Sequence, residues 1–248
     1  MLWYKAWLET RSRFLTSLAT LTIFSSIFVH HALYIACLNT FPCPEEVRHS
    51  GWRSEFHFLL FVNQQYVVLM WILAVVLLGM GGLLREKALG TSSLTLTLPV
   101  SRARLMRVRV AMGIFQAIVL GVVPWLAVLI ISFRAGMPIS VAQVGFYILL
   151  LVGGGLIYFA MAVLVSSLVS GEYTAPALTF GAVLLGAMLF DNWLRRFNVW
   201  RLVTGDFSID RNTFLLSKQV PWPGLLGSLC VAALMLLASV IAVQRKEF

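Results

Sequence analysis

Six long stretches of this 248-residue chain contain no charged residue, and this pattern restricts its possible folds more than any other feature. The stretches without Asp, Glu, Lys or Arg are Phe14–Pro44, Phe56–Leu84, Val110–Phe133, Ala135–Gly171, Tyr173–Phe190 and Gln219–Gln244. Even the shortest, Tyr173–Phe190, is long enough as a helix to cross a hydrocarbon core of about 30 Å. Only 12% of the residues are charged and 60% are hydrophobic, which no soluble surface accommodates. The pattern predicts an integral membrane protein.

Backbone hydrogen bonding then selects the secondary structure. Inside lipid each segment must pair its own N–H groups, so long apolar runs form helices, and these runs lack the alternation of a β-barrel. The predicted fold is an all-α integral membrane protein with six transmembrane helices in one domain, residues 1–248. The expected spans are about 14–38, 60–84, 106–133, 140–168, 173–192 and 222–244. An alternative topology has five spans, with Tyr173–Phe190 re-entrant because Pro176 lies near its start.

Basic residues between the spans predict the orientation. The loop after the second span carries six basic residues and one acid, which makes it hard to translocate, so both termini are predicted to be cytoplasmic. Contact with lipid headgroups accounts for the net charge of +9, and no nucleic-acid partner is expected. The predicted location is the cell (inner) membrane, crossed several times.

Residues 1–13 have the pattern of an interfacial helix that meets the first span at an elbow. Tryptophans beside basic residues suit the cytoplasmic headgroup layer. An ordinary aromatic belt at the end of a span is the alternative interpretation. The residues assigned to this elbow are Trp3, Lys5, Trp7, Arg11 and Arg13.

The sequence contains none of the common signatures of catalysis or metal binding. There is no G-x-x-x-x-G-K-[ST] loop, no G-x-S-x-G, no H-E-x-x-H and no cysteine pair at zinc spacing. No catalytic, cofactor-binding or metal-binding residue is therefore predicted. Cys37 and Cys43 leave a disulfide open as an alternative to two unrelated thiols.

The middles of the spans contain no ionisable residue of the kind that ion-coupled pumps use. His30 and His31, and the run Asn63-Gln64-Gln65, are interpreted as polar residues at the outer ends of the first and second spans. Gly153-Gly154-Gly155, in the middle of the fourth span, is interpreted as a close-packing face first and a hinge second. A chain without an ATP site or a buried ionisable relay is expected to take its energy from a partner.

Residues 85–105 form the cytoplasmic loop that best fits such a partner. Gly90 is expected to end one helix and Ser92 or Ser93 to cap a short next one, on which Leu94 and Leu98 would share a face. Pro99 stops this helix, and Ser101 caps the third span. Exposed leucines beside a basic run are typical of a docking surface for a soluble protein.

The pattern Glu86, Gly90-Thr91 and Leu98-Pro99-Val100-Ser101-Arg102 resembles the signature loop of ABC-2 type transporter permeases. The resemblance implies that residues 1–13 are the connecting helix, and that residues 193–221 form outer re-entrant or interfacial helices. It also implies a coupling element that contacts a separate ATPase subunit. The residues assigned to this coupling element are Glu86, Gly90, Thr91, Leu94, Leu98, Pro99, Ser101 and Arg102.

The resemblance further implies two permease copies, or a permease and its paralogue, with two ATPase subunits that bind the ATP. The cargo would be a lipid, a drug or an amphipathic compound, exported along a path lined mainly by the first, second and fifth spans. One alternative function is a membrane scaffold or immunity-type protein that binds a partner without transport. Another is an intramembrane enzyme that uses His30, His31 or Asp191.

Overall fold

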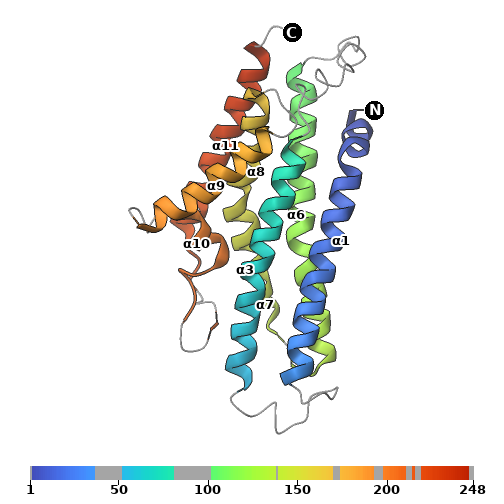
Figure 1. The fold of residues 1–248 in the computed structure, drawn as a ribbon, viewed down its shortest axis with the longest axis vertical. Coiled ribbons are helices and arrows are strands. Elements are labelled where there is room, and N and C mark those ends of the chain that lie inside the picture. Colours follow the sequence, from blue (N-terminus) through green and yellow to red (C-terminus); the bar gives the residue numbers. More distant parts are fainter. Residues whose placement is uncertain are drawn as a thin grey trace.

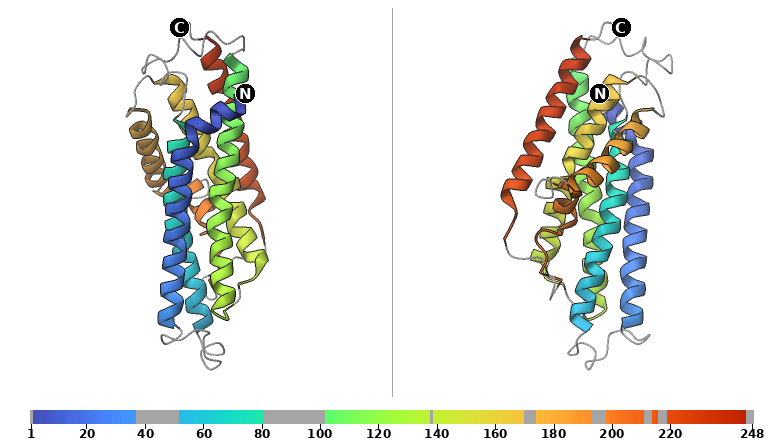
Figure 2. Two further views of the ribbon diagram at one scale, coloured as in Figure 1. Left: turned by 90° about the vertical axis from the view of Figure 1, so that its right-hand side faces the viewer. Right: turned by 60° about the vertical axis from the view of Figure 1, so that its left-hand side comes forward.

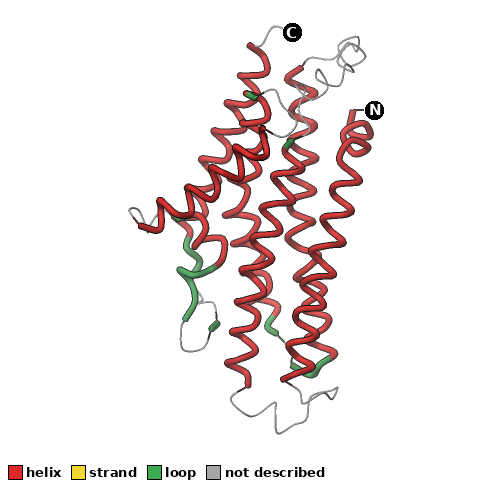
Figure 3. Tube along the Cα trace, viewed as in Figure 1, coloured by secondary structure: helices red, strands yellow, loops and turns green. Residues whose placement is uncertain are grey.

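Helices account for nearly all of the chain that the structure describes. This computed structural model describes residues 2–36, 52–80, 102–137, 139–169, 174–192, 198–210, 214–215 and 219–245. Within these ranges the chain forms helices and no strand (Figure 3). The predicted all-α class is therefore confirmed.

Five helices in the described ranges are long and apolar enough to cross a membrane. They are α1 (Leu2–Ala36), α3 (Trp52–Gly79), α6 (Arg102–Arg134), the continuous stack of α7 (Val141–Leu149), η1 (Leu150–Gly154) and α8 (Gly155–Leu168), and α11 (Trp222–Arg245). The chain is a multi-pass membrane protein by this criterion. The predicted fifth span corresponds to α9 (Thr174–Asn192), whose apolar part, Thr174–Leu189, is shorter than these five.

The helices form an elongated bundle in which successive long helices alternate in direction until α8 (Figure 1). The first turn of α1 and the last turn of α11 lie at the same end of this bundle (Figure 1). The last turn of α3 and the first turn of α6, which residues 81–101 join, also lie there. We call this the N-terminal end of the bundle.

α8 and α11 run in the same direction, so the chain has to return along the bundle between them (Figure 1). α9 makes the first part of this return and is inclined to the other helices (Figures 1 and 2). A short helix, α10 (Val199–Thr204), follows it. Its ends carry recognisable caps, since the Asn198 side chain accepts from the N–H of Trp200 at 2.9 Å and Gly205 has a φ of 82°.

The three glycines in the middle of the fourth long helix each face a different neighbour. A Cβ added to Gly155 would lie 2.5 Å from a ring carbon of Trp71 in α3. One on Gly154 would lie 2.9 Å from Val203 in α10. One on Gly153 would lie 3.3 Å from Leu225 in α11. Consecutive helical residues point about 100° apart, so three glycines open three faces at one level, and the predicted close-packing face is confirmed.

Hydrogen bonds fix the groups around these glycines. The Trp71 ring is fully buried and donates from Nε1 to the Ala117 carbonyl at 3.0 Å. The Ser228 hydroxyl of α11 donates to the Gly154 carbonyl at 2.9 Å. Gly154 is the last residue of the π-helical segment η1, in which i→i+5 hydrogen bonds replace the i→i+4 bonds of an α-helix. This change of pairing leaves the Gly154 carbonyl accessible to the Ser228 hydroxyl.

We expect Gly155→Ala to lower the stability of the chain by about 1–3 kcal/mol, because the added methyl group overlaps an indole that its own hydrogen bond holds in place. Thermal unfolding in detergent measures the effect. Gly145→Ala is the matched control in the preceding helix, since a Cβ there meets nothing within 4 Å. Equal unfolding midpoints for the two variants would contradict the close packing against Trp71.

Candidate functional site

Most residues assigned to the coupling element lie outside the described residues. These are Glu86, Gly90, Thr91, Leu94, Leu98, Pro99 and Ser101. Arg102 is the first residue of α6, and its side chain is not described. The structure does describe the two helix ends that flank the coupling element, and the site is built from them.

The predicted elbow residues belong to the first turns of α1, which runs unbroken from Leu2 to Ala36. No glycine or proline interrupts this range, so the expected boundary after Arg13 is not a helix end. These turns are nevertheless bent relative to the rest of α1 (Figure 2, left). The Thr10 hydroxyl donates to the Ala6 carbonyl at 3.0 Å, and Thr16 donates to the Ser12 carbonyl at 2.8 Å. Such back-bonding bends helices.

The five elbow side chains differ in their surroundings. Trp3 and Arg11 are exposed. Lys5 lies 3.7 Å from Glu9. Trp7 packs edge-to-face on Phe14, with ring centroids 5.7 Å apart. Arg13 donates a hydrogen bond to α3, which is described below.

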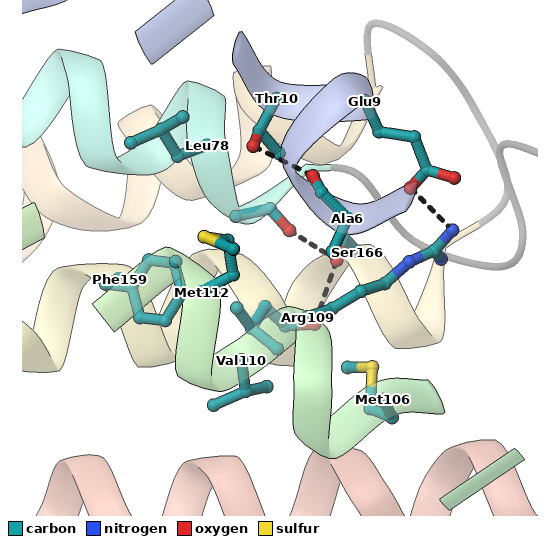
Figure 4. Close-up of a pocket in the computed structure, with 13 residues that line it drawn as sticks. Ala6, Glu9, Thr10, Leu78, Met106, Arg109, Val110, Met112, Phe159 and Ser166 are labelled. Carbon is teal, nitrogen blue, oxygen red and sulfur yellow. Dashed lines mark hydrogen bonds and ion pairs between the residues drawn. The ribbon is translucent and has the colours of Figure 1, made fainter. Parts of the chain in front are cut away.

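An ion pair and a hydrogen bond join the first turns of α1 to α6. Arg109 donates to Glu9 at 2.8 Å, and the Arg109 side chain is only 11% exposed (Figure 4). The next residue of α1, Thr10, accepts from Nε2 of the fully buried Gln116 of α6 at 2.7 Å. A short, half-buried, charge-assisted bond is stronger than an exposed ion pair. The first turns of α1 are thus held to the first part of α6.

The last turn of α3 is held by two other helices. Its final carbonyls have no donor within the helix. Arg13 of α1 donates to the Leu77 carbonyl at 3.2 Å. Ser166 of α8 donates to the Gly79 carbonyl at 3.1 Å (Figure 4). A guanidinium here also complements the negative end of the helix dipole. The end of α3 is therefore linked directly to α1 and α8.

Little free space separates these groups. The cavity between α1, α3, α6 and α8 has a volume of about 30 Å³ and is lined by Glu9, Arg109 and Ser166 among others (Figure 4). That volume holds about two water molecules. A close-packed contact transmits a displacement instead of absorbing it. A force on residues 81–101 would therefore reach α1 and α8 through the ends of α3 and α6.

A second group of polar residues lies in the middle of the bundle, where none was expected. Asn63 and Gln64 are 0% exposed, so their interpretation as interfacial residues is wrong. The reason is that α3 begins at Trp52, which places Gln64 near the helix midpoint. Asn63 donates to Ser25 of α1 at 3.1 Å.

Gln64 connects three elements. Its Oε1 accepts from Nε1 of Trp125 in α6 at 3.1 Å, and its Nε2 donates to the Val203 carbonyl of α10 at 3.0 Å. Val203 also packs on Gly154, at the midpoint of the stack formed by α7, η1 and α8. Both contacts place α10 level with the middle of the bundle, away from its ends.

This position brings an ion pair to the middle of the bundle. NH1 of Arg201, in α10, lies 3.6 Å from Oδ2 of Asp206, and the side chains are 20% and 35% exposed. The sequence prediction placed both residues in the outer segment 193–221 and assigned neither a role of its own. The Asn198 and Gly205 caps could have predicted a short helix there, but its depth depends on the contacts with Gln64 and Gly154.

The remaining sequence candidates do not form a site among the described residues. His30 and His31 are exposed on α1. In the described part of the chain, no three His, Cys, Asp or Glu residues are grouped as metal ligands would be. Cys37, Cys43 and the side chain of Asp191 lie outside what the structure describes.

Comparison of the chain with protein-family models, curated proteins and solved structures finds no match. The functional interpretation therefore depends on the geometry and on the sequence pattern.

We expect a double-mutant cycle of Glu9→Gln and Arg109→Gln to give a coupling energy of about 1 kcal/mol or more, because the short bond between these side chains is half-buried. Thermal unfolding of the four proteins in detergent measures it. The cycle of Lys5→Gln with Glu9→Gln is the control, expected at about 0.3–0.5 kcal/mol for an i,i+4 pair. Equal coupling energies in both cycles would contradict the conclusion that Arg109 holds the first turns of α1 to α6.

We expect Gln64→Met to cost about 1–3 kcal/mol and to speed amide exchange in α10, since the buried Trp125 N–H and Val203 carbonyl each lose a partner. Hydrogen exchange read by mass spectrometry measures this. Gln65→Met is the matched control, because it makes the same change at the next position of α3, where the side chain is only partly buried. Unchanged exchange in α10 after Gln64→Met would contradict its attachment to α3.

Proposed function

We propose that this chain is the membrane-spanning permease subunit of an ABC-2 type transporter, an exporter of a lipid, drug or amphipathic compound. A separate ATPase subunit binds and hydrolyses the ATP, and a second permease copy or a paralogue completes the assembly. The chain itself is not an enzyme and binds no cofactor. It works in the cell (inner) membrane with both termini in the cytoplasm.

One observation supports this proposal above the others: the arrangement of contacts at the N-terminal end of the bundle. The pattern from Glu86 to Arg102 that resembles the permease loop connects α3 to α6. The ends of these two helices are bonded to α1 and α8 by Arg13, Arg109 and Ser166. A partner that pushes on the loop would move four helices together, as a transporter driven from outside its membrane domain requires.

The course of the chain also supports six crossings. Because α8 and α11 are parallel, α9 and the residues up to Trp222 have to complete one crossing between them (Figure 1). We propose that α9 makes the cytoplasmic half of this crossing, and that α10 re-enters to the middle of the membrane. Even with that irregular crossing, both termini lie on one side.

The scaffold alternative lacks a comparable observation. A protein that only binds a partner does not need side-chain bonds that join the ends of four helices. The enzyme alternative is weaker, since His30 and His31 are exposed on α1 and no group of three metal-ligating side chains is found in the described ranges.

We expect the chain to co-purify with a P-loop ATPase encoded beside it, and to stimulate that ATPase several-fold in liposomes. Reversing the charge at Glu86 or Arg102 is expected to abolish the stimulation, because it changes the surface that the ATPase contacts. Arg134→Glu is the matched control, at the opposite end of the same helix as Arg102. Absence of co-purification, or equal ATPase rates for Arg102→Glu and Arg134→Glu, would refute the proposal.

A further inference from the structure

A second and larger cavity lies between α3, α9 and α10. Its volume is about 670 Å³, within the range of about 300–1,000 Å³ that small-molecule sites occupy. Phe61 and Gln65 line it from α3, and Met188 lines it from α9. Because α10 is level with the middle of the bundle, this cavity lies there too.

Charged groups line this cavity where none was expected in the middle of the bundle. Arg201 and Asp206 both border it, together with Trp200. Ionisable residues at membrane depth are expensive and are retained mainly for function. Their separation of 3.6 Å is longer than the 2.8 Å between Arg109 and Glu9. A looser and partly exposed pair is the easier one for a ligand to separate.

The chemistry of the lining defines the ligand. Among the described residues, the lining offers one cation and one anion a few ångströms apart, which match a ligand that carries both charges and no net charge. A phosphate suits the planar donors of Arg201. A quaternary ammonium suits the carboxylate of Asp206 and the face of an indole such as Trp200.

The surface beside the cavity suits acyl chains. Met188 borders the cavity and is 68% exposed, and the neighbouring side chains of α9 are also exposed, Leu184 at 58%, Leu185 at 60% and Leu189 at 63%. These side chains belong to α9, which is inclined to the other helices (Figure 1). A lipid could place its headgroup between α3 and α10 while its chains stay in the bilayer.

We propose that the cavity between α3, α9 and α10 binds the headgroup of a zwitterionic phospholipid, with its phosphate at Arg201 and its ammonium at Asp206. The inference rests on the proposed export function, for which it names the substrate class. Binding itself needs neither the ATPase nor the coupling loop, so it is testable on the chain alone.

Native mass spectrometry of the detergent-purified chain provides the test. The probes are three lipids with dioleoyl tails: a phosphatidylcholine, a phosphatidylglycerol and a trimethylammonium-propane. We expect phosphatidylcholine to bind at least five-fold more tightly than the other two. Glycerophosphocholine, which has the headgroup without the chains, is expected to bind at least ten-fold more weakly, which distinguishes a lipid site from a site for soluble phosphate esters.

Single substitutions are expected to switch the preference. Arg201→Gln leaves Asp206 and favours the cationic lipid, whereas Asp206→Asn leaves Arg201 and favours the anionic one. The double variant is expected to lose the preference among the three lipids. Glu9→Gln with Arg109→Gln, which removes the ion pair between α1 and α6, is the matched control and is expected to keep the preference for phosphatidylcholine.

Met188→Trp gives a second test, because this exposed position accepts a larger side chain without repacking. It is expected to weaken binding of all three lipids by narrowing the cavity.

A wild-type preference for phosphatidylglycerol, as the net charge of +9 alone would give, would overturn the inference. So would an unchanged preference in the double variant. Either result leaves the ATPase experiment unaffected, and loss of ATPase coupling leaves lipid binding unaffected.

Discussion

The close packing of three neighbours on Gly153, Gly154 and Gly155 is the constraint on which the rest of this structure depends. A bilayer supplies little hydrophobic driving force between helices, so their association requires close approach and hydrogen bonds. In this chain the glycines at residues 153–155 provide both the close approach and a hydrogen bond. The glycines admit side chains from α3, α10 and α11, and the Gly154 carbonyl accepts from Ser228. Larger residues at this level would separate all three partners from the fourth long helix.

The position of α10 follows from this packing. A helix of six residues has too few internal hydrogen bonds to persist alone. Val203 fills the space at Gly154, and its carbonyl, which lies in the last turn, accepts from Gln64. The helix is thus stabilised by its contacts with α3 and η1. Irregular backbone at membrane depth is tolerated only when protein surrounds it in this way.

The sequence predicted the parts of this fold that depend on local composition. Charge-free runs indicated the long helices, and a triple glycine indicated close packing. It did not predict the burial of Gln64, because α3 begins eight residues before the expected start of the second span. Composition does not show how far a helix continues past its apolar residues. The bond from Arg13 to the Leu77 carbonyl joins residues 64 apart, and only the relative rotation of α1 and α3 determines it. The coupling residues from Glu86 to Ser101 stay a sequence prediction.

The place of the charges in this chain is consistent with how a membrane protein is inserted. An arginine in the middle of a continuous span costs about 2.5–3.5 kcal/mol on insertion scales, and no long helix here carries one at its midpoint. Arg201 and Asp206 instead belong to a short segment outside the five long helices. Such a segment reaches the middle of the bundle only when it packs on helices that are already inserted. Arg201 and Asp206 then enter as an ion pair and not as two separate charges. The chain thereby acquires a charged cavity without the cost that the same residues would impose within a span.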